Sequence, residues 1–315
     1  MVLESREHDA GSATAPGIGG RRDEPRPPLR VALAQVAPRL DLVTNLERHL
    51  DLIQTARHNE AQLLVFPELS LTGYLLEDLV PEVALRAGSP QLASLAKAAG
   101  GMDIVLGCIL ESDDVRFYNA ALYISAGRIA HVHRKVYLPT YGLFDEHRYM
   151  AAGDCFRRFD IGADSGASSW PAGILICEDM WHPSAAVQLA RQGVDVFICP
   201  SASPGRGVTD DHGLGTARSY DAMTSTYAQL FTAYVVYCNR VGYEDGVYFW
   251  GGSRVVGPDG SVLAAAQERD EELLYCELDR AAVRRARVAY PLLRDERHDV
   301  NDAESDRIRN RRARA

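Results

Sequence analysis

The sequence lacks the features of several common protein classes. None of its apolar runs approaches the roughly 20 residues that span a bilayer. Charged residues and a histidine occupy positions 4 and 6–8, where a secretory signal needs an apolar core. Acidic residues outnumber basic ones, and the net charge of -9 argues against a polyanionic partner. We therefore expect a cytoplasmic protein with no membrane and no nucleic-acid partner.

Motifs for metals, nucleotides and disulfide frameworks are also missing. The six cysteines include no CxxC pair, and a chain of 315 residues is too large to depend on disulfide bonds. There is no HExxH motif, no GxxxxGKS/T loop and no GxGxxG after a strand. We therefore expect no metal and no other cofactor. Four cysteines within apolar runs are expected to be small buried core residues: Cys108, Cys199, Cys238 and Cys276.

Strand and helix patterns alternate through most of the chain. RVALAQVA is typical of a buried strand, LVTNLERHLDLIQTARHNEA has apolar residues at helical spacing, and LLVFPEL returns as a strand. Turns at residues 125–127 and 258–260 separate the strands of two predicted hairpins. The helices indicate an α/β fold and the hairpins require mixed sheets, so we expect two stacked sheets covered by helices.

The two ends of the chain differ from the middle. Residues 1–28 are rich in Gly, Pro, Ala and charge and lack periodicity, which predicts a disordered N-terminal tail. Residues 301–315 (NDAESDRIRNRRARA) predict a polar C-terminal tail. No linker interrupts residues 29–300, which are therefore expected to form a single domain.

Three apolar stretches each lead into a reactive side chain. LLVFPEL ends near Glu68, GRIAHVHRK ends at Lys135, and GILIC ends at Cys177. In open α/β sheets, ligands bind beyond the carboxyl ends of the strands. A thiol can attack an acyl carbon, a carboxylate can move protons, and an ammonium can stabilise an oxyanion. Together the three residues predict a site that hydrolyses a carbon–nitrogen bond.

Each of these residues also has an ordinary interpretation. Cys177 fits the last apolar residue of a core strand, Glu68 a carboxylate exposed beyond a strand, and Lys135 a solvated charge. Pro183 suits the first turn of a helix after Cys177, and a thiol near a helix N-terminus and a cation is expected to shift toward thiolate. The joint occurrence of acid, cation and thiol at strand ends favours the active-site interpretation.

Two further residues lie near this set in the sequence. Glu146 belongs to YGLFDEHRY, where it could position Lys135 or a substrate, or could form a surface salt bridge with Arg148. His182 lies five residues beyond the thiol. We expect it to start a helix, because a catalytic base usually comes from a different segment.

Four segments resemble the nitrilase superfamily of carbon–nitrogen hydrolases: FPELSLTGY, RKVYLPTYGLFDEHRY, ICEDMW and NRVGYEDGVYFWGGS. The likeness is closest to the glutaminase domain of glutamine-dependent NAD synthetases and covers roughly residues 29–295. It implies a four-layer α-β-β-α sandwich. It further implies that Glu68 is the general base, Lys135 the oxyanion stabiliser, Cys177 the nucleophile and Glu146 a supporting carboxylate. The backbone N–H of Glu178 would complete the oxyanion hole.

The resemblance also suggests substrate contacts. Tyr141 and Glu178 fall where glutaminase domains hold the substrate's amino group, and Ser203 and Arg206 lie in the segment that would meet its carboxylate. The stretch SASPGRG departs from the pattern, because it brings Ser203 and Arg206 closer together than those domains do. No SGGxDS-type loop for ATP is found, so we expect no NAD synthesis by this chain alone. Hydrolases of this type often pair, which implies a homodimer or larger homo-oligomer.

The leading hypothesis is therefore an amidase or glutaminase-like enzyme that releases ammonia from a small carboxamide through a cysteine thioester. A nitrilase or an N-carbamoyl-amide hydrolase would use the same residues on another substrate. An alternative of a different class is a noncatalytic partner subunit that keeps the fold and binds another protein. The presence of Glu68, Lys135 and Cys177 together argues against this alternative.

Overall fold

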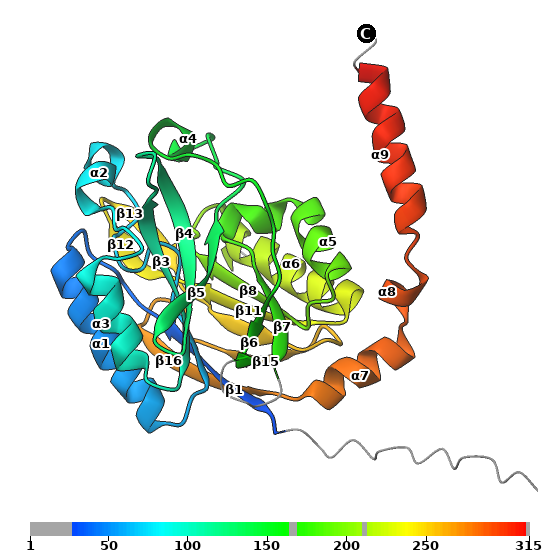
Figure 1. Cartoon of the computed structure of the whole chain (residues 1–315), viewed down its shortest axis with the longest axis horizontal. Helices are drawn as coiled ribbons and strands as arrows, with labels where there is room; N and C mark the ends of the chain where they lie inside the picture. The colour runs from blue at the N-terminus through cyan, green and yellow to red at the C-terminus, as the bar shows by residue number, and fades with distance from the viewer. Residues whose placement is uncertain (1–26, 164–168, 210–212, 313–315) are drawn as a thin grey trace, which may run out of the picture.

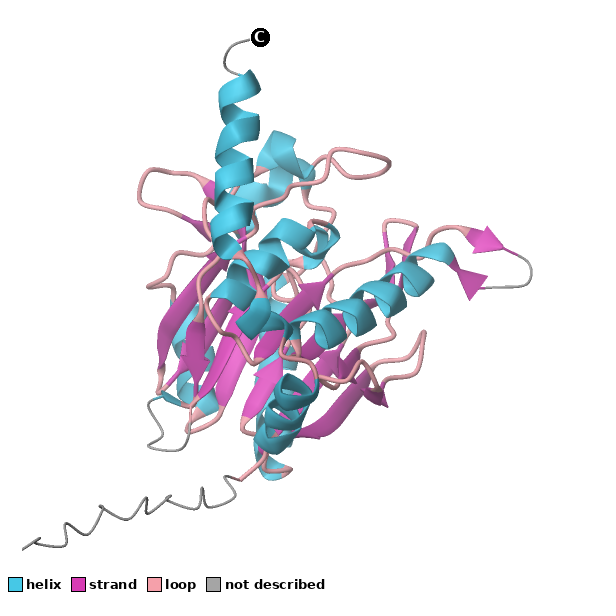
Figure 2. Ribbon diagram, turned by 90° about the vertical axis from the view of Figure 1, so that its right-hand side faces the viewer, coloured by secondary structure: helices cyan, strands magenta, loops and turns pink. Residues whose placement is uncertain are grey.

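Two six-stranded sheets packed face to face form the body of the molecule, with helices on both outer sides (Figures 1 and 2). The computed structural model describes residues 27–163, 169–209 and 213–312. This is the α-β-β-α sandwich expected from the sequence, and both sheets are mixed.

The first sheet has the strand order β16-β1-β2-β3-β4-β5. Its strands are β1 (Leu29–Gln35), β2 (Leu63–Val65), β3 (Asp103–Glu111), β4 (Phe117–Ser125), β5 (Arg128–Arg134) and β16 (Glu272–Leu278). β1, β2 and β3 are parallel, whereas β4, β5 and β16 pair antiparallel with their neighbours. Helices α1 (Leu42–His58) and α3 (Pro90–Ala99) cover the outer face.

The second sheet has the order β15-β14-β11-β8-β7-β6. Its strands are β6 (Phe159–Ile161), β7 (Trp170–Ile174), β8 (Val196–Ser201), β11 (Tyr234–Asn239), β14 (Arg254–Val256) and β15 (Val262–Ala265). β7, β8 and β11 are parallel. Helices α5 (Pro183–Arg191) and α6 (Gly215–Phe231) cover its outer face.

Residues of the central strands are buried on both faces of each sheet. Val31 and Leu33 of β1 pack against the second sheet, whereas Ala32 and Ala34 pack under the helices. Successive side chains of a strand point to opposite faces, so a strand covered on both sides needs apolar residues throughout. This is why RVALAQVA shows no alternation of apolar and polar residues.

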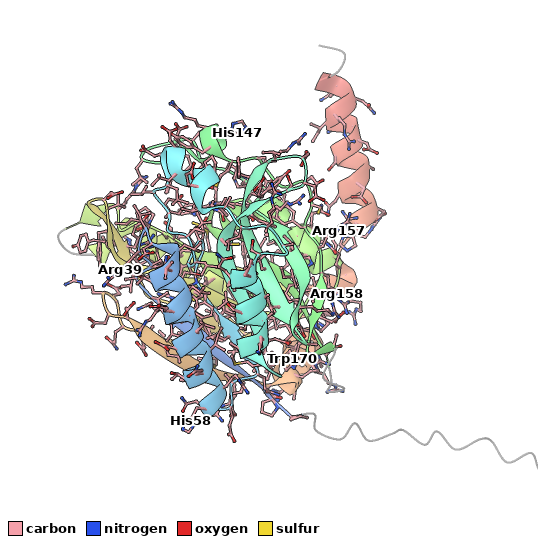
Figure 3. The ribbon with its side chains drawn as sticks, turned by 60° about the vertical axis from the view of Figure 1, so that its left-hand side comes forward. Arg39, His58, His147, Arg157, Arg158 and Trp170 are labelled. Carbon is pink, nitrogen blue, oxygen red and sulfur yellow. The ribbon has the colours of Figure 1, made fainter. Side chains whose placement is uncertain are left out.

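Shorter elements connect the sheets and extend the chain at its end. They are the 3-10 helices η1 (Glu77–Leu79) and η3 (Cys177–Trp181), the helices α2 (Val80–Val83), α4 (Glu146–Tyr149), α7 (Arg280–Ala289), α8 (Leu292–Asp295) and α9 (His298–Arg312), and the strands β9 (Val208–Thr209), β10 (Gly213–Leu214), β12 (Val241–Glu244) and β13 (Val247–Trp250). The outer turns of α9 extend away from the sandwich (Figure 3).

Some details differ from the sequence-based expectations. β7 ends at Ile174, so Cys177 does not end the strand but begins η3. Of the polar tail expected over residues 301–315, residues 301–312 are helical within α9, and residues 301–311 are exposed. Cys276 is only partly buried, because β16 is an edge strand. The expected N-terminal tail lies almost entirely outside the described residues. Within the described ranges, no helix is long and apolar enough to cross a membrane.

Candidate active site

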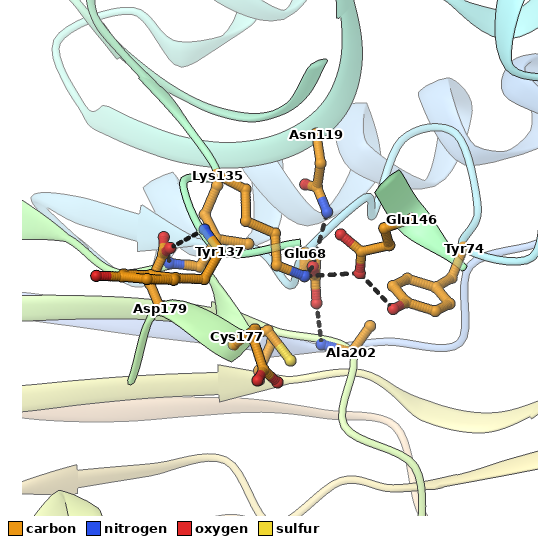
Figure 4. A network of polar contacts seen from close by, with 12 residues as sticks. Glu68, Tyr74, Asn119, Lys135, Tyr137, Glu146, Cys177, Asp179 and Ala202 are labelled. Carbon is orange, nitrogen blue, oxygen red and sulfur yellow. Dashed lines mark hydrogen bonds and ion pairs between the residues drawn. The ribbon is translucent and has the colours of Figure 1, made fainter. Parts of the chain in front are cut away.

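Glu68, Lys135 and Cys177 meet at one edge of the sandwich (Figure 4). Glu68 lies three residues beyond β2, Lys135 directly follows β5, and Cys177 lies three residues beyond β7. β5 runs in the same direction as β2 and β3, because two successive antiparallel pairings separate it from β3. The carboxyl ends of these strands therefore face the same edge, as the sequence predicts.

A buried ion network links three of the predicted residues. Lys135 Nζ donates to Glu68 Oε1 and to Glu146 Oε1, each at 2.7 Å. None of the three side chains is more than 4% exposed. The alternative pairing of Glu146 with Arg148 is not formed: the Arg148 guanidinium lies over the ring of Tyr149 instead.

Neighbouring groups fix the two carboxylates of this network. Asn119 Nδ2 donates to Glu68 Oε1 at 2.7 Å, and the backbone N–H of Ala202 donates to Glu68 Oε2 at 2.8 Å. The Tyr74 hydroxyl donates to Glu146 Oε1 at 2.5 Å. Each carboxylate is thus held in one orientation by donors from different segments of the chain, which is the rigidity that a positioned proton acceptor needs.

Burial and the neighbouring charges shift the pKa values of Lys135 and Glu146 in opposite directions. Burial alone would lower the pKa of Lys135, but the charges of Glu146 and Glu68 outweigh it and hold this pKa well above its usual range. Lys135 is therefore a permanent cation. Burial raises the pKa of Glu146, although Lys135 works against that rise. Opposite charges stabilise one another strongly here because the three side chains are buried away from bulk solvent.

Cys177 sits in a sharp turn. Its backbone has a φ of 45°, which lies in the left-handed region that residues other than glycine seldom adopt. Strained backbone of this kind persists only where the surroundings enforce it. The residue is 6% exposed, and its Sγ lies 3.4 Å from the hydroxyl of Tyr220.

Asp179 supports this turn and ties it to Lys135. Its fully buried carboxylate accepts hydrogen bonds from His133 Nε2 and from the backbone N–H groups of Ile176, Val136 and Tyr137, at 2.9 to 3.1 Å. The Asp179 side chain thus holds the residue that precedes Cys177 and the two residues that follow Lys135. The relative position of the two reactive groups is set by this carboxylate.

The ionisation of Cys177 differs from the sequence-based expectation. The thiol is not shifted toward thiolate: burial, together with the charge of Glu68, raises the pKa of Cys177 to about 12 despite the nearby Lys135. The nearby Lys135 favours the thiolate, but burial and the Glu68 carboxylate outweigh it. At neutral pH the resting thiol keeps its proton, so an attack by sulfur requires a base close by.

Three of the four predicted substrate contacts, Tyr141, Glu178 and Arg206, form one group with Phe144. The Tyr141 hydroxyl donates to Glu178 Oε2 at 2.9 Å, and the Arg206 guanidinium lies 4.7 Å from the centre of the Phe144 ring, which packs edge-on against Tyr141. Burial raises the pKa of Glu178. Ser203 is buried, and its backbone N–H donates to the Asn239 side chain at 2.9 Å.

Other site residues were not predicted from the sequence. Asn119 lies inside β4, and a polar residue within the apolar run FYNAALYIS is a signal that could have identified it. Tyr74 lies within FPELSLTGY but was not singled out. Tyr220 lies on α6 and has no local signal, because only the packing of α6 brings it to the thiol. His182 precedes α5 as expected, stacked on Tyr137.

An α-β-β-α sandwich that gathers a thiol, a buried carboxylate and a buried ammonium at one edge has the features of a nitrilase-superfamily hydrolase. The family model described as "Carbon-nitrogen hydrolase" matches residues 30–288. The chain therefore belongs to the carbon–nitrogen hydrolase family, and it is a hydrolytic enzyme.

Individual relatives agree with this assignment. The chain is 36% identical over 261 residues to a glutamine-dependent NAD(+) synthetase of Thermotoga maritima, covering 80% of this chain and 42% of that protein. It is 32% identical over 303 residues to "Hydrolase in pqqF 5′region" of Pseudomonas protegens, covering 94% and 98%. A carbon–nitrogen hydrolase structure from Helicobacter pylori matches with a TM-score of 0.74 and 25% identity, covering 88% and 98%. The chain spans less than half the length of the synthetases it matches.

Proposed function

We propose that this enzyme hydrolyses a small carboxamide, such as the side chain of glutamine or a similar amide, and releases ammonia through a Cys177 thioester. The observation that carries the proposal is the buried Glu68–Lys135–Glu146 network beside the thiol. A protonated thiol needs a base, and a developing oxyanion needs a cation. The network supplies both from fixed positions.

In the first half of the reaction, Glu68 takes the proton of Cys177 as the sulfur attacks the carbonyl carbon. The carbonyl oxygen becomes an oxyanion, which the Lys135 ammonium and the backbone N–H of Glu178 stabilise. The carbon–nitrogen bond then breaks, Glu68 returns its proton to the leaving nitrogen, and ammonia departs. A thioester between the acyl group and Cys177 remains.

In the second half, Glu68 takes a proton from water, and the resulting hydroxide attacks the thioester carbon. The same two donors stabilise the second oxyanion. The carbon–sulfur bond breaks, the proton held by Glu68 returns to the sulfur, and the acid product leaves. Glu146 keeps its place behind Lys135 throughout, since it shares the ammonium with Glu68. One molecule of amide and one of water thus give one acid and one ammonia.

The groups around the thiol favour a substrate that carries its own charges. The Glu178 carboxylate, held by Tyr141, suits an amino group, and the Arg206 guanidinium suits a carboxylate. Ser203 is proposed to help hold the same carboxylate. Glutamine has both groups, and the synthetases similar to this chain are glutamine-dependent. Self-association of the chain stays a prediction.

The proposal is tested by a screen of ammonia release across glutamine, other primary amides, nitriles and N-carbamoyl amino acids. We expect primary amides to be hydrolysed faster than the other classes, and glutamine faster than an uncharged amide of similar length. Preference for nitriles or carbamoyl amino acids would identify the alternative hydrolase. No ammonia from any class, with Cys177 also resistant to iodoacetamide, would identify a noncatalytic subunit.

Lys135→Met is expected to lower kcat by about 10²- to 10³-fold, the usual loss when one oxyanion donor is removed. KM should change much less, because the ammonium acts chiefly on charge that develops in the transition state. Arg134→Met is the matched control: Arg134 is exposed and its guanidinium lies 4.2 Å from the centre of the Tyr118 ring. Equal small losses in both variants, measured by steady-state kinetics, would contradict the role of Lys135.

A further inference from the structure

Tyr220 is a buried ionisable group at the active site that the proposed mechanism does not use. It is 1% exposed, and its hydroxyl oxygen lies 3.4 Å from Cys177 Sγ. It reaches the thiol from α6, on the second sheet, whereas Glu68 and Lys135 follow strands of the first sheet. The sulfur therefore has a polar neighbour that belongs to neither the base nor the oxyanion stabiliser.

The neighbours of the hydroxyl determine where its proton points. Trp181 Nε1 donates to the Tyr220 oxygen at 3.2 Å, and the Ser201 hydroxyl donates to it at 3.4 Å. An indole N–H can only donate, so the phenolic oxygen is an acceptor in that contact. Because the Trp181 N–H is fixed as a donor to this oxygen, the phenolic proton is directed toward the sulfur.

We propose that Tyr220 is a catalytic residue that donates a hydrogen bond to the Cys177 sulfur and stabilises its negative charge as Glu68 removes the proton. This inference rests on the proposed function, because it assigns a partner to the nucleophile of that reaction. Hydrogen bonds to charged groups are stronger than those between neutral groups, so the contact favours the attacking form of the sulfur over the resting thiol. Burial keeps the pKa of Tyr220 well above its usual range, so the hydroxyl retains the proton it donates.

Other groups also act on the sulfur, and the test must separate them from Tyr220. Lys135 favours the thiolate and Glu68 opposes it. The Ser201 hydroxyl also hydrogen-bonds to the sulfur and lowers the pKa of Cys177. The remaining ionisable groups that interact with the sulfur are Tyr74, Tyr141 and Tyr237. A change confined to the Tyr220 oxygen leaves all of them in place, and the ring of Tyr220 keeps its stacking on Tyr237 at 4.7 Å.

The experiment compares Tyr220→Phe with Tyr227→Phe. Tyr227 lies two turns further along α6, and its hydroxyl donates to the Met180 carbonyl at 2.7 Å. Both variants remove one hydroxyl that joins α6 to η3, but only Tyr220→Phe removes the contact with sulfur. Cys177 alkylation by iodoacetamide is followed at pH 7.5 by mass spectrometry of its peptide, with the exposed Cys155 as internal reference.

Tyr220→Phe is expected to slow alkylation of Cys177 by about three- to tenfold, because a higher thiol pKa lowers the thiolate fraction but raises its nucleophilicity. The kcat/KM for ammonia release should fall by about ten- to a hundredfold. Tyr227→Phe should match the wild type in both measurements, and the Cys155 rate should be unchanged throughout. Alkylation of Tyr220→Phe at the wild-type rate would overturn the inference.

A second variant tests the same point if Tyr220→Phe does not fold. Replacement of Tyr220 by 3-fluorotyrosine keeps the ring and the hydroxyl but makes the hydroxyl a stronger donor. Alkylation of Cys177 should then be faster than in the wild type, and slower alkylation would contradict the inference. Retained ammonia release by Cys177→Ala would instead overturn the proposed function, whatever the result at Tyr220.

Discussion

Cys177→Ala is expected to lower ammonia release by about 10⁴-fold or more, because loss of a covalent nucleophile removes the reaction path itself. The fold should be retained. Removing one buried sulfur costs about 1 kcal/mol of stability, and alanine meets the same backbone requirement at φ 45° as cysteine does. Steady-state ammonia release measures the first effect, and the urea midpoint of unfolding measures the second.

Cys199→Ala is the matched control for this result. Cys199 is fully buried in β8, the strand next to β7, and it packs in the core beneath α5 and α6. This variant also loses one buried sulfur, but from a strand core away from the ion network, so activity should be unchanged. Retention of more than about a hundredth of wild-type activity by Cys177→Ala would show that the reaction does not pass through a thioester.

The parts of the site that follow strands were predictable from the sequence. Glu68, Lys135 and Cys177 each end an apolar stretch, and parallel strands deliver their carboxyl ends to one edge of a sheet. Periodicity thus fixes which residues share an edge. It does not fix which atoms touch, as the pairing of Glu146 shows. The sequence left Lys135 and Arg148 open as partners of Glu146, and the structure forms the pair with Lys135. Residues two apart on the helical turn α4, such as Glu146 and Arg148, do not face each other.

Two properties of the site required the three-dimensional arrangement. Tyr220 reaches Cys177 only because α6 packs on the outer face of the second sheet, and the angle of such packing has no local signature. The pKa of Cys177 depends on burial and on the balance of Glu68 against Lys135. The sequence indicates the presence of these charges but not how much water is excluded, and burial acts more strongly than either charge.

Glu68 has two separable effects on the thiol, and one substitution should move them in opposite directions. As a base it accepts the proton of Cys177, which helps turnover. As a buried negative charge it raises the pKa of Cys177 and so disfavours the thiolate. Glu68→Gln removes both effects while keeping the size of the side chain and an oxygen that can accept from the Ala202 N–H.

Glu68→Gln is therefore expected to lower ammonia release by about 10³- to 10⁴-fold, since both halves of the reaction need the base. Alkylation of Cys177 by iodoacetamide at pH 7.5 should instead become faster. The sign follows because loss of the Glu68 charge lowers the thiol pKa, and at a pH below that pKa a lower value means more thiolate. The two measurements are made on the same preparation, with alkylation read at the Cys177 peptide.

Asp103→Asn is the matched control for the loss of a buried carboxylate. Asp103 begins β3, at the opposite edge of the first sheet, where it accepts from the Tyr123 hydroxyl at 2.6 Å. This variant should be less stable than the wild type but should keep the wild-type ratio of the ammonia-release rate to the Cys177 alkylation rate.

If Glu68→Gln slowed turnover and alkylation together, as general damage to the site would, then Glu68 would be a structural anchor of Lys135. Another group would then have to take the thiol proton. Faster alkylation with lost turnover is the result expected of a charged general base beside a buried thiol.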